Sequence, residues 1–304
     1  MESKKIIVTG GAGFIGTNLV RSIYKGNDLT VIDNLHTGSE TNLDDLISEK
    51  AITFIREDAK NIGKLDLKAD QVFHLGIYSA SPMYRDNPFL VSEVVSGITS
   101  VLEFAKKNNS KVVFASTSSI YNGIKPPHRE DVIPGVTDYY TEARIAAERM
   151  AELYFRLHGV ETSAMRFFSV YGKYENAKKG YANLATQFLW NIKKSEQPVI
   201  YGDGRQRRDF IYAEDVADAL VRATKADGYQ VFNVGSGKNY DLNELVLKIN
   251  KMLGTSIKPK YIEMPVKNYV METLADTTKA EKVLGFRPKV GLDEGLRKLD
   301  QFYR

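Results

Sequence analysis

The sequence of 304 residues contains 42 lysine and arginine residues against 38 acidic residues, a net charge of only +4, and it has no cysteine. So weak a charge gives no reason to expect nucleic acid as a partner. Without cysteine there are no disulfides and no thiolate metal ligands, and the four scattered histidines lack metal-ligand spacing, so we expect no bound metal. No apolar run approaches the roughly 18 residues that cross a bilayer, and we expect a cytoplasmic protein with no membrane partner.

Apolar runs alternate with helical patterns along the first half of the chain, which is typical of a parallel sheet covered by helices. The predicted strands of this half are residues 5–9, 28–32, 52–55, 70–75, 111–116 and 162–167, and the predicted helices are residues 14–25, 84–107 and 137–158. The pattern is more mixed after residue 168, where it predicts helices at 180–194, 213–224, 241–253 and 276–284 and a buried strand at 231–234.

We therefore expect an α/β fold with a doubly wound parallel Rossmann sheet and a smaller mixed α/β C-terminal substrate lobe. Residues 1–168 would form the Rossmann domain, and residues 169–304 would form most of the smaller lobe. Segments such as 207–234 would return to the Rossmann domain.

The most informative stretch runs from residue 5 to residue 33, as a strand, a glycine-rich turn, a helix and a second strand that ends in an acid. The run Gly-Gly-Ala-Gly-Phe-Ile-Gly at 10–16 lets the backbone approach a pyrophosphate, and free N–H groups at the helix N-terminus favour its charge. Asp33 can accept hydrogen bonds from both hydroxyls of an adenosine ribose, and it would repel a 2′-phosphate. The stretch therefore predicts NAD as the cofactor in preference to NADP.

Two later segments carry side chains suited to proton transfer. The strand predicted at 111–116 runs into hydroxyl side chains, of which Thr117 or Ser118 could bind a substrate hydroxyl, although strand-end hydroxyls also cap backbone groups. Tyr140 and Arg144 lie four residues apart on a predicted helix and so share one face. A fixed cation there would favour the phenolate, which could take a proton from a sugar hydroxyl while hydride leaves the same carbon. Taken alone, the pair could equally be an exposed tyrosine and arginine on a helix surface.

Several motifs occur in a fixed order between Ile6 and about Pro288. They are Thr-Gly-Gly-Ala-Gly-Phe-Ile-Gly at 9–16, Ile-Asp-Asn-Leu at 32–35, His-Leu at 74–75, Ser-Thr-Ser-Ser-Ile-Tyr at 116–121, the helix with Tyr140, Arg-Phe-Phe-Ser-Val-Tyr-Gly at 166–172 and Tyr-Gly-Asp-Gly-Arg-Gln-Arg-Arg-Asp-Phe-Ile-Tyr at 201–212. In these motifs the chain resembles the extended short-chain dehydrogenases/reductases of the NAD-dependent nucleotide-sugar epimerase/dehydratase family. Within that family it is most similar to the UDP-glucose (UDP-galactose) 4-epimerases.

The resemblance implies a role for each residue that matches a motif. The catalytic residues would be Thr117, Tyr140 and Arg144. NAD would be held by Gly10, Gly13, Phe14, Ile15, Gly16, Asp33, Asn34, Asp58, Ala59, Leu75, Gly76, Tyr140, Arg144 and Phe168. The nucleotide sugar would be held by Thr117, Ser118, Tyr140, Ser169, Asn183, Leu184, Tyr201 and Arg208. The fork of Arg208 suits a diphosphate because it can make bidentate contacts to phosphate oxygens.

The chain also departs from the family pattern. Arg144 stands where the family has a lysine that also donates to the nicotinamide ribose, and the exchange keeps the charge but changes its shape. Val94 and Ser169 each replace a family asparagine. Lys267 lies near the position of a second diphosphate-binding arginine, which we expect it to replace. These changes affect the identity of the substrate, and Arg144 leaves open whether activity is full or reduced.

The loop that follows Thr117 discriminates between the reactions of the family. In the 4,6-dehydratases the threonine is followed by Asp-Glu, and in UDP-glucuronate decarboxylases a glutamate stands two residues before the loop tyrosine. This chain has Ser118 and Ser119 in those places. Without a carboxylate here we expect epimerisation at C4 of UDP-glucose and UDP-galactose through a transient 4-keto sugar, with Tyr140 as the base. An NAD-dependent sugar or keto-sugar dehydrogenase/reductase and a catalytically weakened nucleotide-sugar-binding protein remain alternatives.

The resemblance further implies a homodimer that pairs through the helices predicted at 84–107 and 137–158. The second helix carries more apolar surface than one core-facing stripe needs, in the residues Ile145, Met150, Leu153, Tyr154 and Leu157. A well-buried helix of a monomer is the alternative.

Overall fold

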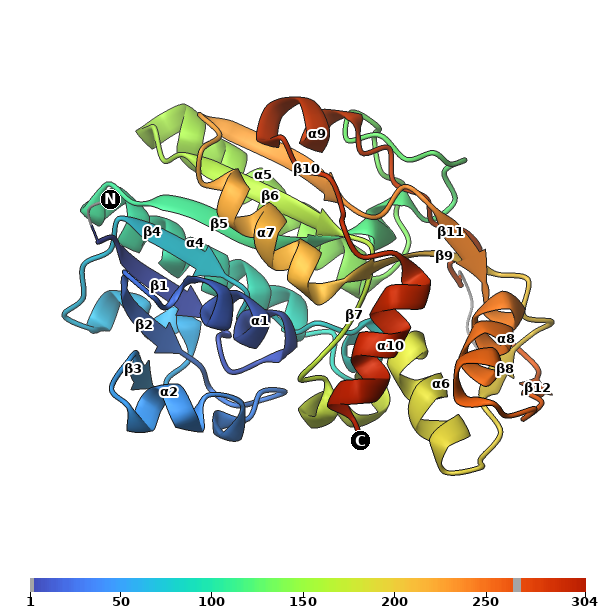
Figure 1. Ribbon diagram of the computed structural model, residues 1–304. Coiled ribbons are helices and arrows are strands. Elements are labelled where there is room, and N and C mark those ends of the chain that lie inside the picture. Colours follow the sequence, from blue (N-terminus) through green and yellow to red (C-terminus); the bar gives the residue numbers. More distant parts are fainter. Residues whose placement is uncertain (1–2, 265–268) are drawn as a thin grey trace.

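The larger lobe of the computed structural model, which describes residues 3–264 and 269–304, contains a parallel sheet of seven strands (Figure 1). The strand order is β10-β6-β5-β4-β1-β2-β3. The bounds are β1 (Lys5–Thr9), β2 (Asp28–Ile32), β3 (Thr53–Ile55), β4 (Gln71–His74), β5 (Lys111–Thr117), β6 (Thr162–Phe167) and β10 (Tyr229–Val234). The order reverses between β1 and β4, which confirms the predicted doubly wound Rossmann sheet.

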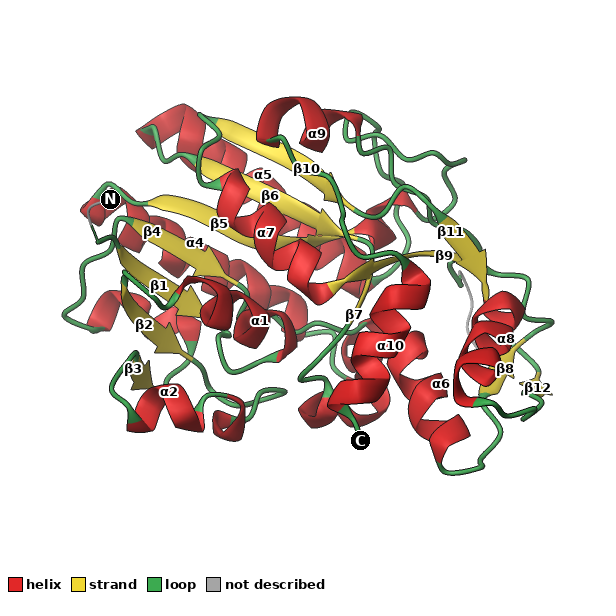
Figure 2. Ribbon diagram, viewed as in Figure 1, coloured by secondary structure: helices red, strands yellow, loops and turns green. Residues whose placement is uncertain are grey.

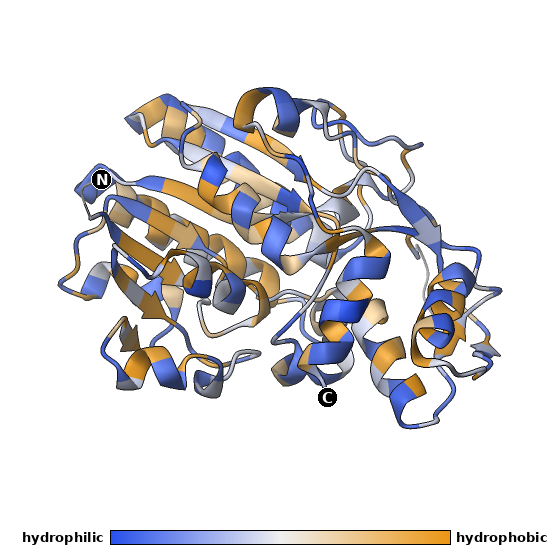
Figure 3. Ribbon diagram, viewed as in Figure 1, coloured by the Kyte–Doolittle hydropathy of each residue, from blue (hydrophilic) through white to orange (hydrophobic). Residues whose placement is uncertain are grey.

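Helices cover both faces of this sheet (Figure 1). One face carries α1 (Phe14–Ile23) and α7 (Ala213–Ala223), and the other carries α4 (Leu90–Asn108) and α5 (Tyr139–His158). Successive strand residues point to opposite faces, so Ile6 and Val8 pack with α1 and α7 whereas Ile7 packs with α4 and α5. Because both faces are buried, the central parts of β1, β2, β4 and β5 are mostly apolar, as the orange of these strands in Figure 3 shows.

The smaller lobe has its own core and its own sheets (Figure 2). A mixed sheet is formed by β7 (Ser169–Tyr171), β9 (Arg207–Tyr212) and β11 (Asn239–Asp241), and a parallel pair by β8 (Val199–Tyr201) and β12 (Lys260–Ile262). The helices α6 (Leu184–Lys193), α8 (Leu242–Leu253) and α10 (Leu292–Phe302) pack around Phe188, Leu245 and Leu296. The predicted smaller mixed α/β lobe is thus confirmed. Within 207–234, β9 belongs to this mixed sheet and β10 to the large sheet.

The helix predicted at 84–107 is wrong in one respect, because the chain forms two helices there. They are α3 (Ser81–Asp86) and α4, separated around Asn87 and Pro88. Proline disfavours helical backbone in the residue before it, and Asn87 accordingly has φ −144° and ψ 91°.

Several other elements were not predicted at all. They are the helix α2 (Asp44–Ser48), the strands β7, β8, β9, β11 and β12, the helix α10, and the 3-10 helices η1 (Glu40–Asn42), η2 (Ala59–Lys64), η3 (Ser118–Tyr121) and η4 (Asn176–Tyr181). The helix predicted at 180–194 begins only at Leu184, after η4, and the helix predicted at 276–284 is α9 (Thr278–Leu284). Within the two described ranges, no helix combines the length and apolar character that a bilayer crossing requires.

Candidate active site

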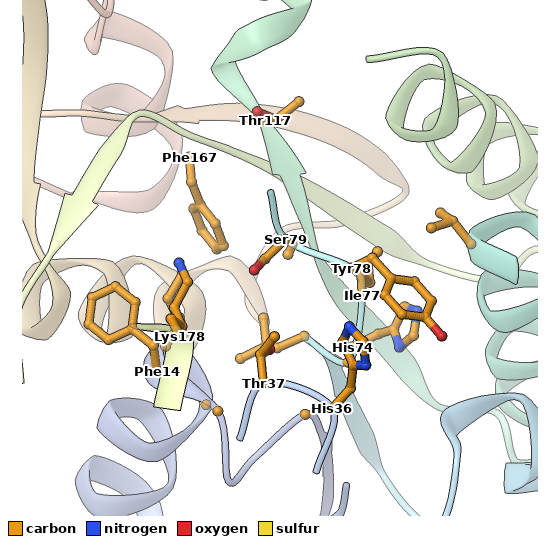
Figure 4. A pocket seen from close by; sticks show the side chains of 18 of the residues that line it. Phe14, His36, Thr37, His74, Ile77, Tyr78, Ser79, Thr117, Phe167 and Lys178 are labelled. Carbon is orange, nitrogen blue, oxygen red and sulfur yellow. The ribbon is translucent and has the colours of Figure 1, made fainter. Parts of the chain in front are cut away.

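A cavity of about 370 Å³ opens at the carboxyl ends of the large sheet's strands (Figure 4). It is lined by most of the residues that the sequence singles out, namely Gly10, Gly13, Phe14, Ile15, Gly16, Asp33, Asn34, Asp58, Ala59, Leu75, Gly76, Thr117, Ser118, Tyr140, Arg144, Phe168, Ser169 and Asn183. Three predicted substrate residues, Leu184, Tyr201 and Arg208, do not line it. The cavity thus brings side chains from both halves of the chain together at the position expected for a dinucleotide.

The glycine turn packs too closely for any side chain at two positions. A Cβ on Gly10, which has φ +69°, would lie 2.5 Å from the nitrogen of Gly76, and a Cβ on Gly16 would lie 2.0 Å from the oxygen of Gly10. The turn leads into α1, whose N-cap residue Gly13 has no side chain to satisfy the first N–H groups. This helix end therefore offers hydrogen-bond donors and a partial positive charge to an anion.

The acid at the end of β2 is held by backbone donors. Asp33 is 6% exposed, and its two oxygens accept hydrogen bonds from the nitrogens of Ala12 at 2.9 Å and Leu35 at 2.8 Å. Burial raises the pKa of Asp33, and these hydrogen bonds oppose the shift. Beside it, the side-chain amide of Asn34 donates to Asp58 at 3.0 Å. These polar groups form one end of the cavity and suit the hydroxyls of a ribose.

The first turn of α5 carries Tyr140 and is fixed by its cap. The carboxylate of Asp138 accepts from the nitrogen of Thr141 at 2.8 Å and from the hydroxyl of Ser81 at 3.0 Å. The guanidinium carbon of Arg144 lies 5.0 Å from the centre of the Tyr140 ring, so the predicted pairing on one helix face is confirmed. The cap fixes the first turn of α5, and Tyr140 on this turn lines the cavity.

The guanidinium of Arg144 is buried, at 3% exposed, and only part of it has a partner in the protein. Its Nη2 donates to the carbonyl of Tyr78 at 2.6 Å, which ties α5 to the loop after β4. Its Nε and Nη1 are buried without a hydrogen-bond partner among the described residues. Buried donors without partners are costly, so these two nitrogens fit a ligand with hydroxyl or other acceptor oxygens. Together with the glycine turn and Asp33, they fit NAD.

Thr117 ends β5 and is placed by the 3-10 helix that follows it. Its hydroxyl oxygen accepts from the nitrogen of Ser119 at 3.1 Å, which leaves its proton available to a ligand. The preceding Ser116 donates to Glu148 at 2.5 Å, and Glu148 also forms a bidentate pair with Arg166. This buried pair was not predicted, although Glu148 follows Arg144 by one helical turn and so lies on the same face of α5.

Arg208 and Tyr201 lie together in a second cluster, organised by Tyr269. The guanidinium carbon of Arg208 is 5.2 Å from the Tyr269 ring centre, and the rings of Tyr201 and Tyr269 are 6.3 Å apart. Within the described part of the chain, the nitrogens of Arg208 reach main-chain carbonyls and Tyr269 but form no ion pair, and burial lowers its pKa. Lys267, for which we expected a similar role, lies outside the described residues.

His74 lies at the base of the cavity and is 1% exposed. Its Nδ1 and the hydroxyl of Thr9 are hydrogen-bonded at 2.7 Å. Burial and the nearby charge of Arg144 lower the pKa of His74 to about 3, so the folded protein holds a neutral imidazole there. A neutral, buried ring that bonds to a neighbouring strand is a packed strand residue rather than a proton donor at neutral pH.

The depressed pKa of His74 predicts a loss of stability in mild acid. Below about pH 6.5 the unfolded chain binds a proton at His74, whereas the folded protein does not bind it until about pH 3. This contribution to stability is therefore complete above about pH 6.5 and decreases as the pH falls below that value. Between pH 7 and pH 5, the wild type should lose on the order of 1–2 kcal/mol more unfolding free energy than His74→Asn, which retains a hydrogen bond but does not titrate. Urea unfolding at both pH values measures this, and identical losses in the two proteins would contradict it.

The comparisons with known proteins agree with this geometry. Residues 6–235 match the NAD dependent epimerase/dehydratase family. The chain is 31% identical over 312 residues to UDP-glucuronic acid decarboxylase 5 of Arabidopsis thaliana, which covers 100% of this chain and 90% of that protein. Its fold is similar to that of the UDP-N-acetylglucosamine 4-epimerase of Methanobrevibacter ruminantium, with a TM-score of 0.93 and 30% identity over 100% of this chain and 99% of that one.

The UDP-glucose 4-epimerase of Thermotoga maritima is similar to the same degree, with a TM-score of 0.92, 29% identity and 98% of each chain covered. Together with the family match, these likenesses confirm the resemblance that the motifs indicate and confirm NAD as the cofactor. The chain belongs to the NAD dependent epimerase/dehydratase family.

Proposed function

We propose that the protein epimerises a UDP-hexose at C4, with UDP-glucose and UDP-galactose as the first candidates. The observation that carries the proposal is that Thr117, Tyr140 and Arg144 line the same cavity as the glycine turn and Asp33. A proton acceptor, a hydroxyl donor and a cation are thereby available at one place, beside the groups that fit NAD. This is the set that oxidation and reduction of a secondary alcohol requires.

In the proposed reaction, Tyr140 removes the proton of the sugar 4-hydroxyl as hydride leaves C4. NAD, when bound, supplies the hydride acceptor and later returns the hydride. Arg144, whose guanidinium lies over the Tyr140 ring, stabilises the phenolate and offers its two free nitrogens to ribose oxygens. Thr117 donates a hydrogen bond to the 4-oxygen. Epimerisation would require the 4-keto sugar to turn in the site, and Tyr140 would then give the proton back to the 4-oxygen.

The positions of the carboxylates in the cavity favour epimerisation over the elimination and decarboxylation found in other members of the family, because none of them lies in the hydroxyl loop. Among the described residues, the acids that line the cavity are Asp33, Asp58 and Glu93. Asp33 and Asp58 belong to the ribose end, and Glu93 pairs with Lys60 of η2 at 2.9 Å. Ser118 and Ser119 follow Thr117, so no acid stands in the hydroxyl loop itself. A dehydrogenase that releases NADH, or a keto-sugar reductase that consumes it, is the second candidate, because either would use the same three residues.

We propose that the nucleotide end of the substrate lies in the smaller lobe. This lobe would comprise residues 169–304 apart from the helix α7 and the strand β10, which belong to the larger lobe. Asn183 lines the cavity, and Leu184 begins α6 immediately after it. Arg208 is a cation with no carboxylate partner among the described residues, and its fork can pair with a diphosphate. We propose that Tyr201 lies against the base and that a bound substrate extends from the cavity to this cluster.

The experiment that tests the proposal is to incubate the purified protein with UDP-glucose or UDP-galactose and to follow conversion by NMR. We expect each sugar to yield the other without net formation of NADH. UDP-N-acetylglucosamine and UDP-glucuronate serve as parallel substrates, and Arg144→Lys tests the unusual cation. Net NADH would favour the dehydrogenase, and absence of turnover with all four sugars in both proteins would end the epimerase proposal.

Replacing Asp33 with asparagine should relax the choice of cofactor. The carboxylate would repel a 2′-phosphate, so we expect the wild type to bind NAD more tightly than NADP and Asp33→Asn to reduce this preference about tenfold. Calorimetric titration with both cofactors measures the ratio. Asp28→Asn is the matched control, since Asp28 is exposed at the opposite end of β2. An unchanged ratio in Asp33→Asn would show that another residue excludes NADP.

We also propose a homodimer formed by α4 and α5. On α5 the side chains of Leu153 and Leu157 are 44% and 65% exposed and lie one turn apart, whereas Tyr154 packs inward and donates to Glu103 of α4 at 2.7 Å. Burying the two leucines between protomers would remove this apolar surface from water. Light scattering after gel filtration should give twice the mass of 34.2 kDa, and Leu157→Glu should yield monomers. A wild-type monomer at micromolar concentration would contradict this.

A further inference from the structure

One cation of the cavity has no place in the reaction described above. Lys178 belongs to η4 and lines the cavity, and its ammonium lies 5.5 Å from the centre of the Phe14 ring. In Figure 4 its side chain runs beside Phe14 towards Phe167. Across the two described ranges it forms no hydrogen bond or ion pair that would neutralise it. The charge is therefore available to a ligand.

The surroundings of Lys178 favour an anion. Phe14 is the first residue of α1, which has no side-chain cap, and Asn183 caps α6 on the same cavity. The N-terminal ends of two helices of ten residues each thus border the cavity near this ammonium. Of the acids that line the cavity among the described residues, Asp33 and Asp58 belong to the ribose end and Glu93 pairs with Lys60, and none of them forms a salt bridge with Lys178.

The nearest acid along the chain, Glu175, is already engaged. Its carboxylate accepts from the nitrogen of Asn183 at 2.9 Å and from the hydroxyl of Thr186, and burial raises its pKa. Glu175 is 0% exposed, and the charge of Lys178 lowers its pKa against the effect of burial, but no hydrogen bond or salt bridge joins the two side chains among the described residues. A ligand anion would not have to compete with a formed ion pair.

The segment that carries Lys178 is anchored at both ends. The nitrogen of Glu175 donates to the hydroxyl of Tyr303 at 2.9 Å, which ties the segment to the C-terminal helix. The side-chain amide of Gln187 donates to the carbonyls of Ala182 at 2.6 Å and Gly180 at 3.2 Å. Because the backbone is held in advance, binding through Lys178 requires the ordering of little more than one side chain.

We propose that Lys178 binds a diphosphate at this end of the cavity through a charge-assisted hydrogen bond. The proposal rests on the proposed function, which puts two diphosphates in the site, one from NAD and one from the nucleotide sugar. Lys178 is a binding residue that closes over the diphosphate from the smaller lobe, opposite the glycine turn. It takes no proton in the reaction.

The test compares Lys178→Gln with Lys179→Gln, the exposed neighbour that does not line the cavity. Protein freed of nucleotide is titrated calorimetrically with NAD, adenosine, UDP and uridine at low and high salt. We expect Lys178→Gln to weaken the binding of NAD, of UDP or of both about tenfold, with a smaller salt dependence, and to leave adenosine and uridine unchanged. Loss for NAD alone assigns the cofactor diphosphate, and loss for UDP alone assigns the substrate diphosphate. Lys178→Arg should retain most of the affinity, and Lys179→Gln should match the wild type.

Two outcomes would overturn the proposal. One is unchanged affinity of Lys178→Gln for both NAD and UDP. The other is an equal loss for the ligands without phosphate, which would reveal a purely structural role. A wild-type protein that binds NAD and UDP but converts no sugar would end the proposed epimerase activity and would leave the role of Lys178 standing.

Discussion

Replacement of Tyr140 with phenylalanine is expected to lower kcat about a thousandfold, because a positioned general base contributes roughly 10²–10⁴-fold and no neighbour can take its place. The nearest candidate, Tyr84, has its ring centre 5.4 Å from that of Tyr140, but its hydroxyl donates to the carbonyl of Tyr78 at 2.9 Å. Burial raises the pKa of Tyr84 to about 12, so it stays protonated. Conversion of UDP-sugar by NMR measures the loss, and NAD affinity should change little.

The matched control for this variant is Tyr139→Phe. Tyr139 precedes Tyr140 on α5, is 53% exposed and does not line the cavity, so its loss should leave kcat unchanged. If Tyr140→Phe retains more than about a tenth of the wild-type kcat, another group removes the proton and the proposed mechanism is wrong.

Loss of the carboxylate at Glu148 is expected to lower the free energy of unfolding by about 3–5 kcal/mol, the largest effect on stability that we predict. Glu148 and Arg166 are 6% and 5% exposed, and Arg166 reaches both oxygens of Glu148 at 3.0 and 2.7 Å. In Glu148→Ala the guanidinium would remain buried without its counterion, and Ser116 at the cavity would lose its acceptor. Urea unfolding at pH 7 measures the change.

The control for this prediction lies one turn further along the same helix. Glu152 pairs with Arg156 at 2.6 Å, but the arginine side chain is 71% exposed, so Glu152→Ala should cost no more than about 1 kcal/mol. A similar cost for Glu148→Ala would mean that the buried pair adds nothing beyond a surface pair. The double variant Glu148→Leu, Arg166→Met should recover much of the loss, because it removes the unpaired charge as well.

The elements near the N-terminus were predictable because their signals are local. About thirty residues contain the strand at 5–9, the turn at 10–16 and the acid Asp33. Glycine is required in this turn because a neighbouring backbone segment occupies the space that a Cβ atom would need. The i, i+4 spacing likewise determines that Tyr140 and Arg144 share a face. The break at Pro88 also has a local cause, although it was not predicted.

The partners of these residues were not predictable in the same way. The acceptor of Arg144 is a main-chain carbonyl 66 residues away, and a carbonyl has no identity that a sequence pattern could reveal. The three-residue strands of the smaller lobe, such as β7 and β8, are too short to show a period of two and exist because a distant strand pairs with them.

The sequence by itself determined the class of the fold, the dinucleotide turn and the shared helix face of Tyr140 and Arg144, since each depends on neighbours along the chain or on a helical repeat. Only the tertiary structure decided that Lys178 reaches the cavity, that Tyr201 and Arg208 lie outside it around Tyr269, and that Glu148 is buried against Arg166. The physical reason is that these contacts depend on how two lobes and two sheet faces pack, and packing joins segments whose spacing along the chain carries no periodic signal.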